Sequence, residues 1–459
     1  MSGPLILRDY TAVPKENGDF CRSFQEALDN GHIRVEHLLR EDEEKREKEE
    51  RLQIFQANGS EGRTWKYAGS FTWQGQQVMI GSRFDQGDKN WFLAYVIEKA
   101  MGIPLHAFPE LSSDTGHGTH DLLLAVLYLR QLKDALMQGY YRQYRTFRYN
   151  DSSPRGWLDV ARHLRLNPMN NGTCAYAARE YTLDNPVNRL ILLARRCLIQ
   201  KGGAVRSLVE RTIRQDSDLS AALRQLEWAM GSTMDTPAGK ALLYQAGRPI
   251  VHPCYGQYEP LRRTSAQIVR RQGLQLLQSG EVPGAGVVIP MDRAWELFLE
   301  HAVMGGIPGL KAQQSKPILI PDGGGAGKRT LKPDFLLPRG EGLAVLDAKY
   351  KIGWQNAYCT GTWENREDVF QILSYLLCFK AGRGGLIFPA PEEKLSDGPV
   401  PQRFWLNGGE PKGQDVWLLP VAIPNSANCR DYGEYVQRLE ASCRRTRQSI
   451  TEQFLGWLP

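Results

Sequence analysis

The sequence predicts a mixed α/β protein of the α+β type, built from more than one domain. Its 459 residues exceed the size of a typical single hydrophobic core. Polar and apolar residues alternate between positions 64 and 80, which predicts a β-hairpin. Residues 90–102 and 120–138 instead carry apolar positions at helical spacing and end near glycines. A helix followed by two strands is predicted within residues 291–351.

We expect three segments along the chain. Residues 1–120 are predicted to form an N-terminal α+β domain. Residues 121–280 form a mostly helical middle region, because the apolar spacing is helical over long stretches and is broken near Gly202 and Gly203. Residues 281–459 form a C-terminal domain that carries the most informative motifs. The function is therefore sought first in the last segment.

Composition and charge describe an ordinary folded protein. Hydrophobic residues make up 42% and charged residues 24% of the chain, far from a disordered composition. The net charge of +6 is too modest to predict a nucleic-acid partner by itself. The 8 cysteines show no CxxC or CxH spacing, which indicates reduced thiols and a cytoplasmic location. No signal peptide and no 18-residue apolar run is found in the sequence, so a membrane protein is not expected.

Arginines alternate with aromatic residues between positions 139 and 165. Guanidinium groups suit phosphate contact and aromatic rings suit base stacking, so this stretch is a candidate DNA-binding surface. The alternative is a scaffold in which the rings are core and the arginines pair with acids such as Asp151 and Asp159. Both interpretations stay open. The candidate DNA-binding residues are Arg142, Arg145, Arg148 and Arg155.

The C-terminal segment begins with a helix and a hairpin that bring acidic residues together. Asp292 is predicted to cap a helix on which Glu296 lies beside the buried face. The stretches LKPDFLLP (331–338) and LAVLDAKYK (343–351) are predicted strands. Residues two apart on a strand share a face, so the side chains of Asp347 and Lys349 emerge together. Asp334 lies near the start of the neighbouring strand, within reach of both.

This arrangement suits phosphodiester hydrolysis. The reaction needs a hard cation, and carboxylate oxygens are the ligands that Mg²⁺ or Mn²⁺ prefers. Asp334 and Asp347 are the predicted metal ligands, and Glu296 completes the metal shell. The Lys349 ammonium would orient the attacking hydroxide and offset negative charge in the transition state. The alternative is a buried strand that ends in an exposed Asp347–Lys349 ion pair of little consequence.

The motifs K-P-D and L-D-A-K resemble the signature of the PD-(D/E)xK nuclease superfamily. The later stretch EDVFQILSYLLCF places Gln371 and Tyr375 four residues apart, which matches the QxxxY element of a subset of that superfamily. The resemblance implies a restriction-endonuclease-like fold for residues 281–459. It also implies a catalytic set formed by Asp334, Asp347, Lys349, Glu296, Gln371 and Tyr375.

More specifically, the chain resembles the McrC family, the nuclease subunit of modification-dependent restriction systems. The stretches MDRAWELF, LKPDFLL, LAVLDAKYK and DVFQILSY carry this resemblance, and GSRF (81–84) and NDSSPRGWLDVARHL (150–164) carry it more loosely. It implies a DNA endonuclease of antiphage defence whose residues 1–120 dock onto a hexameric AAA+ GTPase, McrB. A related AAA+ ATPase is the alternative partner.

Two rival functions stay open. One is a stand-alone PD-(D/E)xK restriction or repair nuclease, and the other is a non-catalytic scaffold that activates an AAA+ partner. Arg83 in GSRF is a candidate for stimulating the partner's nucleotide hydrolysis, or else it forms a salt bridge at the end of a strand.

Overall fold

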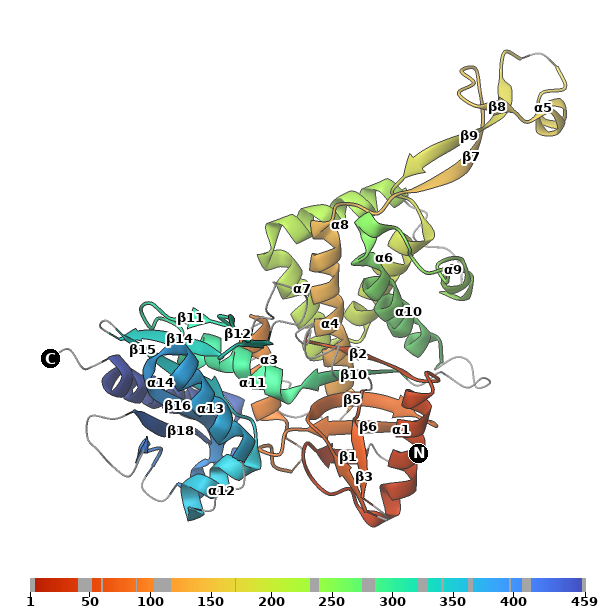
Figure 1. Cartoon of the computed structure of the whole chain (residues 1–459). Helices are drawn as coiled ribbons and strands as arrows, with labels where there is room; N and C mark the ends of the chain where they lie inside the picture. The colour runs from red at the N-terminus through yellow and green to blue at the C-terminus, as the bar shows by residue number, and fades with distance from the viewer. Residues whose placement is uncertain are drawn as a thin grey trace. The chain divides into compact units, whose positions relative to one another are not determined.

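The computed structural model of the chain is shown in Figure 1. It divides into two compact units, of which the first combines residues 1–120 with 283–459 and the second spans residues 121–282. The residues that the structure describes are 5–39, 52–58, 61–87, 89–102, 117–169, 171–231, 239–274, 285–319, 329–339, 342–361, 366–395, 398–406 and 414–455.

A five-stranded sheet forms the N-terminal part of the first unit, with the order β1-β6-β5-β10-β2. The predicted hairpin is confirmed: β5 (Tyr67–Trp73) and β6 (Gln76–Gly81) pair antiparallel. Gln74 and Gly75 connect them with positive φ at both positions, which suits a tight hairpin turn. The remaining elements are β1 (Leu5–Arg8), α1 (Gly18–Asp29), β2 (Arg34–His37), the separate hairpin β3 (Phe55–Asn58) and β4 (Glu61–Thr64), and the predicted helix α3 (Trp91–Met101).

The strand β10 (Ala285–Pro290) joins this sheet from a distant part of the sequence. It pairs antiparallel with β5 and parallel with β2. The expected boundary at residue 281 assigns these residues to the C-terminal segment, whereas in the structure they complete the N-terminal sheet. The chain passes from β10 directly into α11 (Met291–Phe298), so the sheet fixes where that helix begins.

The C-terminal part of the first unit is a six-stranded mixed sheet with the order β11-β14-β15-β16-β18-β17. Its centre is parallel from β15 to β16 to β18, while β14 and β17 pair antiparallel at the sides. The strands are β11 (Lys311–Ala312), β14 (Phe335–Arg339), β15 (Gly342–Ala348), β16 (Ala381–Pro391), β17 (Gln402–Trp405) and β18 (Asp415–Ile423), and a small separate sheet pairs β12 (Lys316–Leu319) with β13 (Arg329–Leu331).

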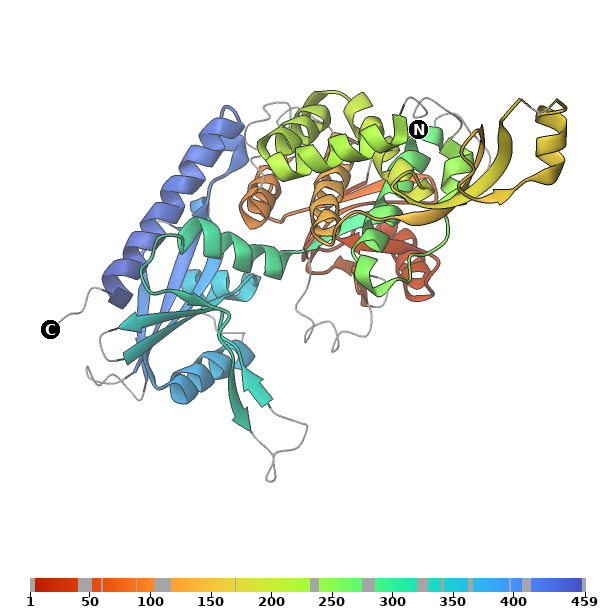
Figure 2. The same cartoon turned by 90° about the horizontal axis from the view of Figure 1, so that it is seen from above.

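Helices cover both faces of this sheet. An added Cβ at Gly384 would meet Ile372 of α13 (Arg366–Phe379), whereas one at Gly385 would meet Phe454, just beyond α14 (Tyr432–Ile450). Successive residues of a strand face opposite sides, so α13 and the end of α14 lie on opposite faces of β16. Figure 2 shows this arrangement from above. The short helix α12 (Ile352–Thr360) connects β15 to α13.

Two local predictions in this segment were wrong. Asp292 is not a helix cap, because α11 already begins at Met291 and its last turns continue as a π-helix over Leu299–Val303. The predicted strand 331–338 is split between β13 and β14. Pro333 lies in the break and has no N–H to donate to a ladder, so the two halves pair with different strands.

The second unit consists mainly of helices and carries a β-arm, which the expected helical middle region does not include. A long hairpin of β7 (Gln143–Asp151) and β9 (Cys174–Thr182) extends beyond the helices of this unit (Figure 1). Its tip holds β8 (Trp157–Leu158) and α5 (Val160–Leu166). The helices are α4 (His117–Met137), which spans the boundary of the unit, α6 (Pro186–Gln200), α7 (Gly203–Gln215), α8 (Ser217–Met230), α9 (Gly239–Gln245) and α10 (Tyr258–Leu274).

The predicted mixed α/β fold class is confirmed by these sheets and helices. Among the residues that the structure describes, no helix combines the length and the hydrophobicity needed to cross a lipid bilayer.

We expect Gly69→Ala to destabilise the first unit. Gly69 has a φ of 149°, and a Cβ there would lie 2.2 Å from the carbonyl oxygen of Val287 in β10. The added methyl group must therefore push β10 away from β5, at a cost of about 2 kcal/mol or more. Thermal unfolding followed by circular dichroism measures the effect. Gly382→Ala is the matched control, because its Cβ meets nothing within 4 Å; equal midpoints for both variants would contradict the close packing of β10.

Candidate active site

The end of β15 presents the two residues that the sequence placed on one face. Asp347 is buried, and the Lys349 side chain is 11% exposed. The ladder to β16 continues past β15, because the Lys349 backbone N–H donates to the Ile387 carbonyl at 2.8 Å. Both side chains therefore share a direction, and the Lys349 Nζ lies 2.6 Å from Asp347 Oδ2. The pair is nearly enclosed by protein, so it is not the exposed ion pair of the alternative interpretation.

Asp334 joins this pair from the neighbouring strand. It lies immediately before β14, which pairs with β15, and its Oδ2 accepts a hydrogen bond from the Ala348 backbone N–H at 2.7 Å. Its backbone carbonyl accepts from the Gln313 N–H at 2.9 Å. The carboxylate is thus fixed at the strand end where Asp347 and Lys349 emerge. The predicted convergence of these three residues is what the structure shows.

Negative charge is concentrated at this point. Burial raises the pKa of Asp334 well above its ordinary value, and the nearby charges of Asp347 and Glu296 raise it further. Glu296 is buried on α11, and the Arg293 Nη1 donates to its Oε2 at 2.7 Å. Burial would lower the pKa of Lys349, but the charges of Asp347 and Asp368 outweigh it and raise the pKa. The lysine is therefore an ammonium among carboxylates.

The donor set fits a divalent cation held by two carboxylates. Mg²⁺ commonly takes only one or two protein carboxylates and completes its shell with waters and substrate phosphate. Burial is the main cause of the raised pKa of Asp334 and the charge of Asp347 is the next, and a cation between the two carboxylates would offset both effects. In the described part of the chain, no group of three or more Asp, Glu, His or Cys side chains is arranged to hold a metal ion. Asp334 and Asp347 are the two predicted ligands that meet at this strand end, and the charge of Glu296, the third predicted ligand, also raises the pKa of Asp334.

Gln371 and Tyr375 connect Lys349 to the segment that carries Asp334. Both lie on α13, and the Lys349 Nζ donates to Gln371 Oε1 at 2.6 Å. The Gln371 Nε2 donates to the Tyr375 hydroxyl at 2.9 Å, and that hydroxyl donates to the Lys332 carbonyl at 3.2 Å. The i,i+4 spacing puts both side chains on one helix face. The relay fixes the orientation of the amide and holds the ammonium in place.

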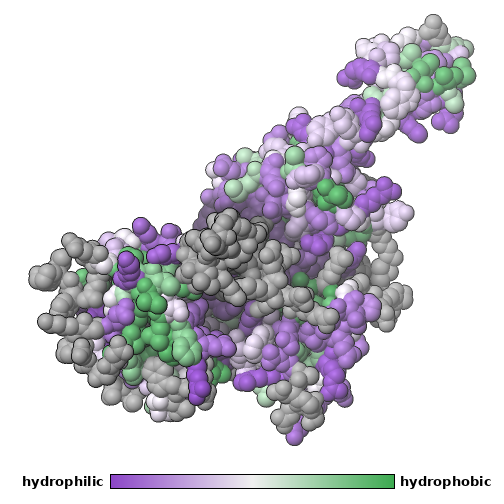
Figure 3. All heavy atoms as spheres, in the orientation of Figure 1, coloured by the Kyte–Doolittle hydropathy of each residue, from purple (hydrophilic) through white to green (hydrophobic). Residues whose placement is uncertain are grey.

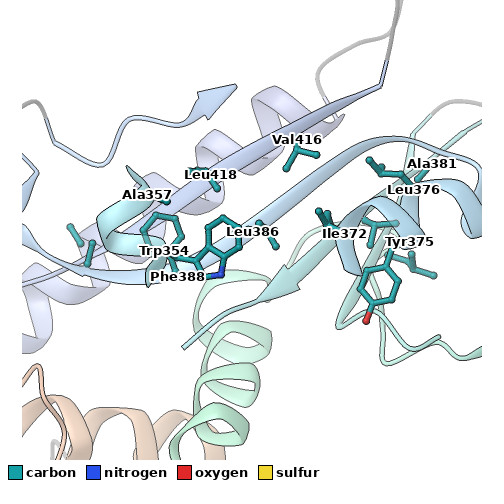
Figure 4. Packing of buried hydrophobic residues seen from close by; sticks show 14 of the residues in the cluster. Trp354, Ala357, Ile372, Tyr375, Leu376, Ala381, Leu386, Phe388, Val416 and Leu418 are labelled. Carbon is teal, nitrogen blue, oxygen red and sulfur yellow. The ribbon is translucent and has the colours of Figure 1, made fainter. Parts of the chain in front are cut away.

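The hydrophobic core beneath the site anchors these polar residues. Tyr375 packs with Ile372 and Leu376 of α13, and Trp354 packs beside Phe388 of β16 in the same cluster (Figure 4). The polar tips of these rings are the parts that reach hydrogen-bond partners, as is usual for buried Tyr and Trp. Packing thus determines where α13 presents Gln371.

The predicted catalytic set does not include a second carboxylate that faces Lys349. Asp368 is buried on the first turn of α13, and its Oδ1 lies 3.4 Å from Lys349 Nζ and 2.9 Å from Lys351 Nζ. The Trp354 indole N–H donates to its Oδ2 at 2.9 Å. Burial pushes the pKa of Asp368 up, but the charges of Lys349 and Lys351 lower it overall. The signal in the sequence is the spacing of three residues that puts Asp368 on the same face of α13 as Gln371.

Arg83 lies inside the protein, in a cluster that holds Tyr350. Its side chain is 6% exposed, and its Nη1 lies 3.5 Å from Asp9 Oδ2. Its guanidinium stacks 4.2 Å from the centre of the Tyr350 ring and donates to the Tyr350 carbonyl at 3.2 Å. The Tyr350 hydroxyl bonds to Ser82 Oγ at 2.9 Å. The salt-bridge interpretation of Arg83 is the one that the structure supports, and the cluster fixes the residue next to Lys349.

The four candidate DNA-binding arginines lie on or beside the β-arm of the second unit. Arg142, Arg148 and Arg155 are exposed. Arg145 is paired with Asp184, with 3.1 Å between Nη1 and Oδ2. The guanidinium of Arg155 lies over the Tyr149 ring at 5.6 Å. The scaffold interpretation therefore describes Arg145, while the exposed arginines could contact phosphate.

Comparisons with known proteins complete this description. The comparison with curated proteins finds no match. Among solved structures, a refined half-complex from a tetradecameric assembly of Thermococcus gammatolerans McrB AAA+ hexamers with bound McrC contains a chain at 13% identity and a TM-score of 0.49, with 97% of this chain and 100% of that chain covered. A cryo-EM structure of the Thermococcus gammatolerans McrBC complex matches at 15% identity and a TM-score of 0.33, with 67% and 89% covered.

The family assignment rests on the sequence match. The model of a family described as McrBC 5-methylcytosine restriction system component matches residues 63–389, which is more than half of the chain. The matched range includes Asp334, Asp347 and Lys349 as well as α13, which carries Gln371 and Tyr375. This confirms the family that the sequence motifs indicated: the chain belongs to the McrBC 5-methylcytosine restriction system components.

Proposed function

We propose that the chain is the metal-dependent DNA endonuclease subunit of a McrBC-type restriction system that acts in antiphage defence. The observation that carries the proposal is the convergence of Asp334, Asp347 and Lys349 at one end of β15. The Gln371–Tyr375 relay behind them supports it. These residues are those expected of a PD-(D/E)xK nuclease that hydrolyses DNA phosphodiesters.

Each residue has a physical task in this reaction. Asp334 and Asp347 would hold Mg²⁺ or Mn²⁺, which when bound polarises the scissile phosphate and acidifies a water molecule. The Lys349 ammonium lies next to Asp347 and can donate to the attacking oxygen or to the phosphate as negative charge develops. Gln371 accepts one hydrogen of that ammonium and so orients the others. Tyr375 keeps the Gln371 amide in the required orientation.

The rival functions are less well supported. A scaffold that has lost catalysis has no need of two buried acids held side by side, an arrangement that raises the pKa of Asp334 and is costly without a further partner. A stand-alone nuclease would not require membership of a family of restriction system components. We therefore favour a subunit that works with a partner, as an AAA+ GTPase or ATPase hexamer would provide.

DNA would contact the exposed arginines of the β-arm in this proposal. Arg142, Arg148 and Arg155 present guanidinium groups that suit phosphate oxygens. Arg145 is partly exposed and pairs with Asp184, so it would have to exchange that partner to bind phosphate. Such contacts would add affinity without reading the DNA sequence.

The tip of the same arm offers a surface for a protein partner. Trp157, Leu164 and Met169 are 56%, 67% and 83% exposed there, and Figure 3 shows hydrophobic residues gathered at the end of the arm. Contiguous exposed apolar side chains are typical of interaction sites. We propose that the AAA+ partner covers this tip, in addition to the docking proposed for residues 1–120. Because residues 1–120 share one compact unit with residues 283–459, deleting them is not a clean test.

We expect Asp347→Asn and Lys349→Met to abolish cleavage by the assembled complex without loss of folding. The first removes a metal ligand and the second removes the charge-stabilising ammonium, while both roughly keep side-chain volume. Removing one group of this kind typically lowers the reaction rate by about 100-fold to 1,000-fold. Plasmid cleavage gels measure activity, and circular dichroism checks the fold. Cleavage at the wild-type rate by purified Asp347→Asn would remove the site assignment.

Cleavage should require Mg²⁺ or Mn²⁺ and should not be supported by Ca²⁺. Ca²⁺ binds oxygen ligands in a larger and looser geometry and activates water less well. The measurement is the initial rate of plasmid cleavage after dialysis against a chelator and addition of each cation. Undiminished cleavage in excess chelator would rule out a metal-dependent reaction.

The isolated chain should cut DNA poorly and gain activity with its AAA+ partner and nucleotide. We expect the combined variant Trp157→Ser, Leu164→Ser and Met169→Ser to lose copurification and stimulation, because it removes the exposed apolar surface. The control is Leu166→Ser, which changes a less exposed residue of α5, the helix that also carries Leu164. Robust cutting by the isolated chain, unaffected by partner and nucleotide, would instead favour a stand-alone nuclease.

A further inference from the structure

The ammonium of Lys349 competes with any cation for Asp347. It lies 2.6 Å from Asp347 Oδ2 and 2.6 Å from Gln371 Oε1. Asp347 is a metal ligand in the proposed function, on which this inference rests. A lysine that stays tightly paired with that carboxylate would reduce its negative charge and weaken cation binding. The site therefore needs a second anion that shares the ammonium.

Asp368 is placed to be that anion. Its Oδ1 lies 3.4 Å from Lys349 Nζ, on the side of the ammonium provided by α13. The Trp354 indole N–H and the Lys351 ammonium both bond to its carboxylate, at 2.9 Å each, which fixes its position. It also lies in the first turn of a helix, where the helix dipole stabilises a negative charge. Asp368 is thus held in place and charged, and it reaches Lys349 from α13, whereas Asp347 reaches it from β15.

We propose that Asp368 is a positioning residue, which shares the Lys349 ammonium with Asp347 and so leaves Asp347 available to a divalent cation. The ammonium donates to Gln371 and lies within ion-pair distance of Asp347 and Asp368, so three oxygen acceptors surround a group that has three N–H donors. When a cation binds Asp347, the ammonium can shift toward Asp368 and so remains paired with a carboxylate before and after cation binding. Lys349 can therefore remain beside the reacting phosphate after a cation binds.

The test is Mn²⁺ binding by isothermal titration calorimetry to the full-length chain, with no cleavage involved. Asp368→Asn should weaken Mn²⁺ binding by about 10-fold to 100-fold, as loss of groups that orient metal ligands usually does. In a Lys349→Met background the same substitution should change the affinity by no more than about twofold, because no ammonium remains to be shared. The effect must depend on Lys349.

The control is Glu367→Gln, which removes one negative charge from the adjacent, exposed position of α13. It should leave Mn²⁺ affinity within about twofold of the wild type, because exposed charges are screened. Circular dichroism verifies folding. If Asp368→Asn does not fold, Asp368→Glu replaces it, since it shifts the carboxylate and should again change affinity only when Lys349 is present.

Two results would overturn this inference and leave the proposed function intact. One is a wild-type Mn²⁺ affinity for Asp368→Asn. The other is an equal loss of Mn²⁺ affinity with and without Lys349, which would indicate a general effect of charge or packing. A wild-type chain that binds no Mn²⁺, or binds it without need of Asp347, would overturn the proposed function as well. The two failures are therefore distinguishable.

Discussion

The hydrogen bond from the Ala348 backbone N–H to the Asp334 carboxylate holds two mutually repelling acids at one place. It depends on the antiparallel pairing of β14 with β15, and that pairing depends in turn on the parallel ladder from β15 to β16. Burial and the charge of Asp347 both raise the pKa of Asp334, so the site stores unfavourable charge. The sheet is stable enough to maintain this arrangement, and a divalent cation is what would relieve it.

Three other groups of residues support this strand end from different sides. The helix α13 presents Gln371 and Asp368 to Lys349 from one face of the sheet. The Arg83 cluster of the N-terminal sheet holds Tyr350, the residue that follows Lys349. Since β10 completes that N-terminal sheet and leads into α11, the two sheets of the first unit are also joined through the chain at this helix. The N-terminal sheet thus contributes to the position of Lys349.

Local patterns predicted the elements well because local forces determine them. Alternation predicted the hairpin of β5 and β6, and helical spacing with a terminal glycine predicted α3, whose Gly102 adopts the left-handed conformation. Motif spacing also predicted a single site made of Asp334, Asp347, Lys349 and Gln371. The structure brings these residues together. Their chemistry remains a prediction.

Contacts between distant segments could not be predicted in this way. Nothing in the local pattern of residues 285–290 indicates that they insert between β5 and β2, since pairing partners are chosen by the tertiary structure. The same is true of Arg83, whose burial depends on Tyr350, far along the chain. Pro333 carried a readable signal, because a proline within a predicted strand indicates a break.

The most direct test of the central claim is a crystal structure of the chain soaked with Mn²⁺, with anomalous diffraction recorded to locate the ion. The account predicts one strong anomalous peak between the carboxylates of Asp334 and Asp347, with the Lys349 ammonium beside it. That peak should disappear in Asp347→Asn. A peak elsewhere in the first unit, or no peak at an Mn²⁺ concentration that supports cleavage, would contradict the account.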